Sequence, residues 1–90
     1  MYVGVVVGSV VATRKDDDLV GKKLLIVQKV NPSQRNSMNS MEVAVDSVGA
    51  GTGEYVLVTK GESARNVFGT SNSIIDSAIV AIVDSMEVCE

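Results

Sequence analysis

The chain of 90 residues contains no histidine, no tryptophan, one proline and one cysteine. A single cysteine, Cys89, cannot form a disulfide within the chain. Histidine is the commonest zinc and copper ligand and a frequent general base, so its absence removes the first choice for both roles. We therefore expect no metal site, no cofactor and no catalytic residue.

Aromatic side chains and basic charge are also scarce. Tyr2, Tyr55 and Phe68 are the aromatic residues, and 8 basic residues against 11 acidic ones give a net charge of −3. Nucleic-acid-binding domains use basic grooves and stacked aromatic rings. The pairs 14–15 and 22–23 flank three consecutive aspartates and form no basic stripe. A nucleic-acid partner is therefore not expected.

Long apolar runs are missing as well. The longest, residues 78–83, has the length of one short strand, whereas a membrane-spanning helix needs about 20 apolar residues. The first twelve residues lack the basic start of a secretion signal. The sequence therefore predicts no membrane partner, and a cytoplasmic location is the expectation that follows.

Valine and isoleucine dominate what is present, in short runs between glycine and polar clusters, as is typical of a small all-β barrel or sandwich. One domain is expected, with strands over residues 2–13, 24–30, 41–48, 55–60 and 78–86. A short helix is predicted over residues 62–68, with Gly61 as its N-cap. Residues 14–21 are predicted to form a charged turn with positive φ at Gly21, and residues 31–40 an exposed, mobile loop.

Three of these expected strands are apolar on both faces. Residues 24–27, 55–58 and 78–83 do not alternate with polar residues as a half-solvated antiparallel sheet does. One face fills the interior, and the other needs cover that a short chain without a long helix does not supply. A second subunit is the simplest cover. The alternative that stays open is a small sandwich that hides both faces within one chain.

The glycine-rich segment 49–54 has some likeness to a nucleotide-binding loop. It leads into a strand instead of a helix, and it lacks both the G-x-G-x-x-G spacing and the Lys-Ser/Thr pair of a P-loop. A tight turn between the third and fourth strands is the favoured interpretation. We expect a positive φ or a close backbone approach at Gly49 or Gly51, and strain for a valine at Gly51.

Groups suited to acid–base or nucleophilic chemistry are scattered along the chain. Asp46, Glu54, Asp76 and Asp84 stand at strand ends or turns, where short acidic side chains commonly bond to the local backbone. A Ser–Lys dyad stays an alternative for which the sequence has no motif. Arg65 is either a surface residue with a weak helical partner or a bridge to a neighbouring carboxylate. An enzyme is not expected.

Several stretches together match a known family. They are residues 8–15, 19–28, 43–54, 56–58, 61–65 and 75–84, which together extend over nearly the whole chain. The most specific is Ala-Val-Asp-x-Val-Gly-Ala-Gly-x-Gly-Glu at residues 44–54. On these residues the chain resembles the EutN/CcmL family, the vertex proteins of bacterial microcompartments.

The resemblance implies a small five-stranded barrel related to the OB-fold, with a short helix, as a single vertex domain over residues 1–90. It implies a homopentamer that caps a shell corner, with hexameric facet proteins of the same compartment as further partners. The loop expected around a narrow pore on the five-fold axis comprises Gly49, Ala50, Gly51, Thr52, Gly53 and Glu54. The expected subunit-interface residues are Arg65, Asp76, Ile79 and Ile82. The expected location is a microcompartment shell in the cytoplasm. An OB barrel that binds nucleic acid is the alternative, disfavoured by the few aromatic residues.

Overall fold

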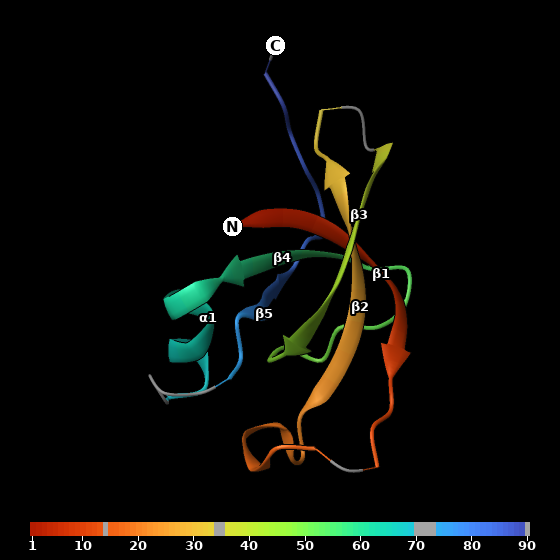
Figure 1. Cartoon of the computed structure of the whole chain (residues 1–90). Helices are drawn as coiled ribbons and strands as arrows, with labels where there is room; N and C mark the ends of the chain where they lie inside the picture. The colour runs from red at the N-terminus through yellow and green to blue at the C-terminus, as the bar shows by residue number, and fades with distance from the viewer. Residues whose placement is uncertain (14, 34–35, 70–73, 90) are drawn as a thin grey trace.

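The computed structural model describes residues 1–13, 15–33, 36–69 and 74–89, except for the side chains of residues 36–38. Within these residues, five strands close into a barrel in the order β1-β2-β3-β5-β4 (Figure 1). The elements are β1 (Tyr2–Val10), a 3-10 turn η1 (Asp17–Leu19), β2 (Lys23–Asn31), β3 (Asn36–Asp46), β4 (Tyr55–Lys60), α1 (Gly61–Val67) and β5 (Ser77–Ile82). Neighbouring strands are antiparallel except β3 and β5, which are parallel. The predicted five-stranded all-β barrel with one short helix is confirmed.

Aliphatic side chains fill the barrel interior. Every strand contributes, and the buried residues of this cluster are Val6, Leu25, Val27, Ala44, Ala50, Val56, Val58 and Ile79. Each of them is at most 2% exposed. Removal of this apolar surface from water, at about 25 cal/mol per Å², is the main term that holds the strands together.

A second, smaller cluster lies on the outer face of the barrel. It contains Val45 of β3, Ala64 of α1, Ile75 from the segment before β5, and Ala78 of β5. Because Ala44 faces the interior, the alternation of side chains along β3 turns Val45 outward, where it belongs to the same cluster as Ala64 of α1. The short helix therefore supplies part of the cover that the apolar strands need. No helix among the described residues is long and apolar enough to cross a membrane.

Several strand ends differ from the sequence prediction. β1 ends at Val10, before residue 13, and β5 ends at Ile82, before residue 86. The prediction of a loop over residues 31–40 is wrong for its second half, because β3 begins at Asn36. Pairing of β2 with β3 continues to the hairpin end, where Asn31 lies opposite Asn36. Backbone hydrogen bonds supply this pairing, so polar side chains do not prevent it. Residues 34–35 lie outside the described residues.

Glycines act at two points of this architecture. A Cβ atom on Gly4 of β1 would lie 2.3 Å from Cγ1 of Val27, so the Val27 side chain occupies the space that a side chain at position 4 would need. Gly21 has a φ of +77°, as predicted for the turn before β2. The predicted N-cap is wrong, because Lys60 occupies that position and α1 begins at Gly61.

Candidate functional site

The segment between β3 and β4 is a loop organised by one carboxylate. Asp46, the last residue of β3, accepts hydrogen bonds from the backbone N–H groups of Val48 (3.1 Å), Gly49 (2.9 Å) and Ala50 (3.0 Å). A carboxylate that accepts charge-assisted bonds from successive N–H groups fixes the backbone that it caps. The expectation that Asp46 bonds to its local backbone is therefore confirmed.

The glycines of this loop differ in their backbone conformation. Gly49 has a φ of +81° and Gly53 a φ of +90°, in the left-handed region that other residues rarely adopt. Gly51 lies outside that region, so the expected positive φ is found at Gly49 and the expected strain of a side chain at Gly51 is not. Instead, the N–H of Gly51 donates to Oε1 of Glu54 over 2.6 Å, which closes the loop on itself.

The rest of the barrel holds the loop from both sides. Ala50 is 0% exposed and belongs to the interior cluster, while the Lys23 ammonium of β2 donates to the Ala50 carbonyl oxygen. On the other side, the N–H of Gly53 donates to the Val6 carbonyl oxygen over 2.7 Å, and the N–H of Val6 donates to the Glu54 carbonyl oxygen over 3.0 Å. Thr52 and Gly53 remain exposed at the tip. The loop therefore has a defined shape within one subunit.

The predicted interface residues lie at different depths. Arg65 is half-buried on α1, and within the described part of the chain its guanidinium has no ion-pair partner. Asp76 is exposed, and its carbonyl oxygen accepts the Gly61 N–H over 2.9 Å. Ile82 is half-buried at the edge of the interior cluster. Ile79 is 0% exposed inside the barrel, so its side chain has no surface to offer to a neighbour.

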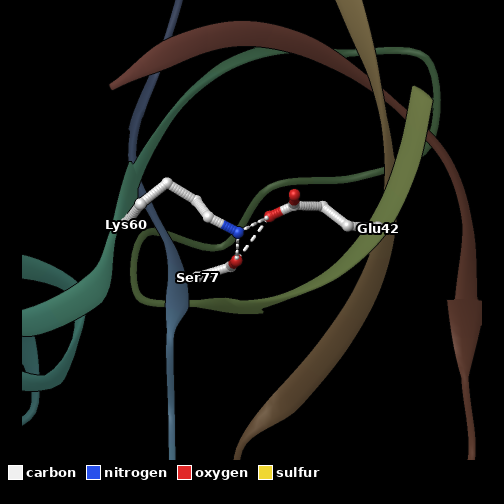
Figure 2. Close-up of polar contacts among 3 residues, drawn as sticks. All are labelled: Glu42, Lys60 and Ser77. Atoms are coloured by element: carbon white, nitrogen blue, oxygen red, sulfur yellow. Dashed lines mark hydrogen bonds and ion pairs between the residues drawn. The ribbon is translucent and has the colours of Figure 1, made fainter. Parts of the chain in front are cut away.

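A polar cluster that the sequence did not indicate joins three strands. Figure 2 shows the side chains of Glu42 (β3), Lys60 (β4) and Ser77 (β5) pointing toward one another. The Lys60 ammonium lies 2.7 Å from Oε1 of Glu42 and donates to Ser77 Oγ over 2.6 Å, and the Ser77 hydroxyl donates to the same carboxylate oxygen. The three residues are far apart in sequence and meet through barrel closure, so no local pattern could reveal them.

The surroundings set the ionisation of this Glu42–Lys60–Ser77 cluster. Burial opposes the charged form of Glu42, but the hydrogen bonds from Lys60 and Ser77 and the charge of Lys60 outweigh it and lower the pKa of the Glu42 carboxyl. Burial, with the Glu42 carboxylate nearby, raises the pKa of the Tyr2 phenol. At neutral pH the cluster therefore holds an ionised carboxylate beside a neutral phenol.

Ser77 and Lys60 are paired as in a Ser–Lys dyad, but their surroundings do not suit activation of the serine by the lysine. A lysine acts as a general base only through a free amine, whereas the Lys60 amine is held in an ion pair with Glu42. Ser77 is also 3% exposed, so a substrate would not reach its hydroxyl. This geometry is that of a structural polar contact that links the strands.

Apolar side chains gather on the outer face next to the second cluster. A hollow of about 140 Å³ there is lined mainly by Leu19, Leu24, Val43, Val45, Ile74 and Ile75. Val43 and Ile74 at its walls are 48% and 58% exposed. We call this surface the apolar groove. Clustered exposure of large aliphatic side chains is typical of an interaction surface.

The sequence and the fold both match known shell proteins. The family model described as "Ethanolamine utilisation protein EutN/carboxysome" matches residues 1–84. The bacterial microcompartment shell vertex protein PduN of Salmonella typhimurium is 48% identical over 89 residues, which cover 96% of this chain and 98% of PduN. The shell vertex protein GrpN of Rhodospirillum rubrum is 47% identical over 87 residues, which cover 97% of each chain.

Solved structures agree with this relationship. The GrpN pentameric microcompartment shell protein from Rhodospirillum rubrum aligns with a TM-score of 0.89 at 44% identity over 100% of both chains. An ethanolamine utilization protein EutN aligns with a TM-score of 0.92 at 39% identity over 98% of this chain and 91% of that one. Sequence motif, barrel topology and full-length similarity coincide, and the chain belongs to the EutN/CcmL family.

Proposed function

We propose that the protein is a shell vertex protein, five copies of which form a ring that caps a corner of a bacterial microcompartment. The observation that carries this proposal is the match, over the full length of both chains, with the pentameric shell protein GrpN. A flat hexagonal layer closes into a polyhedron only when five-fold points interrupt it. The role is therefore geometric, and the protein acts on no substrate.

The outer surface of the subunit supports assembly into a ring. The walls of the apolar groove, Val43 and Ile74, are left half exposed in the single chain, together with Met41, which is 64% exposed. Burial against a neighbouring copy would stabilise the ring by about 25 cal/mol per Å² of apolar surface. In a cyclic ring each subunit uses two different patches, and the chain of contacts closes after a fixed number of copies. In the proposed ring, the contact between subunits also includes Arg65, Asp76 and Ile82.

The loop over residues 49–54 lies around the five-fold axis in the proposed ring. Its shape is set within one subunit, by Asp46 on one side and by the bonds to Val6 on the other. Five such loops come together without refolding, so little conformational entropy is lost there on assembly. The exposed residues Thr52 and Gly53 line the narrow opening.

The proposed surroundings of the ring follow from its place at a corner. Its outer rim contacts hexameric facet proteins, and the whole assembly lies in the shell of a compartment in the cytoplasm. Full-length similarity to PduN, which is named a shell vertex protein, supports this placement.

Native mass spectrometry of the purified protein tests the ring, and a pentamer is the expected species. A monomer at micromolar concentration would contradict the proposal, and a hexamer would contradict the corner role. Val43→Glu places a charge in the apolar groove and is expected to dissociate the ring. Val11→Glu is the matched control, because Val11 is 93% exposed and has no cover to lose. Equal assembly of both variants would show that the groove is not the subunit interface.

Electron microscopy of a host that lacks the gene tests the corner role. Facet proteins and cargo are still made in such a strain, and the expected shells are elongated or open. Reintroducing the gene is expected to restore compact polyhedra. Closed shells of normal shape in the deletion strain, with no second vertex-type gene present, would assign the corners to another protein.

A further inference from the structure

A second hollow, of about 350 Å³, lies where β1 ends and β2 begins. Its walls include the aliphatic residues Val10, Val11 and Leu24 and three basic residues, Lys15, Lys22 and Lys23. A hollow of this volume has room for roughly ten water molecules at about 30 Å³ each, which is the size of a small organic molecule. Such hollows bind ligands when apolar walls are combined with a few polar groups.

The charged side chains that line this lysine-lined hollow are all basic. Three of the five lysines of the sequence line it and no acidic residue does, although the chain carries a net charge of −3. Among the described residues, the one ion pair is that between Lys60 and Glu42, so these three lysines are not neutralised by a carboxylate. The Asp16 carboxylate accepts the Asp18 N–H over 3.0 Å in η1 and does not line the hollow.

The three ammonium groups keep donors for a ligand. Lys15 Nζ donates to the Ala12 carbonyl oxygen over 2.7 Å, and Lys23 Nζ donates to the Ala50 carbonyl oxygen. Lys22 Nζ lies 5.5 Å from the centre of the Phe68 ring. An ammonium group has three N–H donors, so each of these contacts leaves others free. The side chains of all three lysines line the hollow, so their charges lie at its wall.

We propose that this hollow binds a small organic anion, namely a carboxylate or phosphate group on a short apolar stem. The ammonium groups take the anion, and the stem lies on the wall of Val10, Val11 and Leu24. Val11 is 93% exposed, and a stem would cover it. The hollow adjoins the apolar groove at Leu24, but none of the three lysines lines that groove.

The proposal is tested by titrating the assembled, isotope-labelled protein with butyl phosphate, ethyl phosphate, inorganic phosphate, butyrate and neutral butanol. The expected result is saturable binding of butyl phosphate, with amide shifts confined to residues 9–12, 15 and 22–24. Affinity is expected to rise roughly fourfold for each methylene buried, from ethyl to butyl phosphate. It is expected to fall as salt is added. The comparison of butyrate with butyl phosphate shows which anionic group the site prefers.

Lys15→Gln and Lys22→Gln are each expected to weaken butyl phosphate binding by about tenfold, the usual effect of losing a charge-assisted hydrogen bond. Lys29→Gln is the matched control, because Lys29 loses the same charge but lies over the Tyr2 ring instead of in the hollow. Val11→Glu changes an exposed wall residue, so it leaves the fold intact and is expected to abolish binding. Butanol binding as tightly as butyl phosphate, or equal affinity of the Lys15, Lys22 and Lys29 variants, would overturn the proposal.

Discussion

The seam between β3 and β5 has the shortest ladder of the barrel among the described residues. Two residue pairs, Val45 with Ala78 and Asp46 with Ile79, form its parallel ladder among the described residues. The Glu42–Lys60–Ser77 cluster crosses the same seam with side chains (Figure 2). We therefore predict that neutralising Glu42 destabilises the fold, although the residue lies in no predicted site.

The size of this effect follows from exposure and bond type. The side chains of Glu42 and Lys60 are 30% and 43% exposed, so their ion pair contributes about 0.2–1 kcal/mol. The Ser77 hydroxyl is buried, and its bond to a carboxylate adds about 1.5–3 kcal/mol. Glu42→Gln keeps an acceptor for Ser77 and is expected to lower the free energy of unfolding by about 1 kcal/mol. Glu42→Ala removes that acceptor and is expected to cost about 2 kcal/mol.

The same cluster predicts a direction for the dependence of stability on pH. The pKa of Glu42 is lowered from its ordinary value of 4.5 in the folded state. The stabilisation is therefore fully present above about pH 4.5 and is lost as the pH falls through the lower pKa of the folded state. The difference in unfolding free energy between the parent and Glu42→Gln is expected to be constant near neutral pH and to shrink below about pH 4.5.

Urea unfolding of the parent, Glu42→Gln, Lys60→Met and the double variant measures the coupling. All four are compared at one subunit concentration, because assembly adds a concentration-dependent term to stability. A coupling energy of about 0.5–1 kcal/mol is expected. Glu87→Gln, which removes the same charge from an exposed position after β5, is the control and is expected to change little. A coupling below about 0.3 kcal/mol together with a pH-independent difference would refute the reasoning.

Three further predictions concern backbone positions. Gly49→Ala is expected to cost about 1 kcal/mol because its φ is +81°, and thermal unfolding beside Gly51→Ala, which lacks that strain, checks this. Asp46→Ala removes the acceptor of three N–H groups and is expected to lower the free energy of unfolding by about 2 kcal/mol, seen as a lower urea midpoint. An unchanged midpoint would contradict this. Gly4→Ala places a Cβ 2.3 Å from Val27 and is expected to cost about 1–3 kcal/mol, and retention of the parent melting temperature would contradict it.

Strand positions in the centre of the sequence were predictable because each strand there coincides with a run of apolar residues. β4 occupies Tyr55–Lys60 as predicted, between a glycine turn and a helix start that both leave local signals. The polar half of β3 was not predictable, since Asn36 and its neighbours pair through backbone groups that carry no side-chain signature. The predicted helix start was one residue too late for a related reason. The N-cap is Lys60, which makes no side-chain capping hydrogen bond and so leaves no capping signal in the sequence.

In the loop over residues 49–54, part of the conformation is predictable from neighbouring residues and part is not. The turn and the role of Asp46 follow from residues within four positions of one another, so the sequence alone indicates them. Which glycine takes positive φ depends on how Ala50 enters the interior and where β1 bonds the loop. For that reason the strain lies at Gly49 and Gly53 instead of Gly51.

The sequence by itself determined the fold class and the family, because short apolar runs between glycine and polar clusters, and one continuous motif, are properties of neighbouring residues. Tertiary structure decided what depends on barrel closure. It buried Ile79 in the interior, brought Glu42, Lys60 and Ser77 together, and gathered Lys15, Lys22 and Lys23 around one hollow. Contacts between residues 17 to 35 positions apart, as in the Glu42–Lys60–Ser77 cluster, depend on strand register and closure, which the local pattern of the chain does not encode.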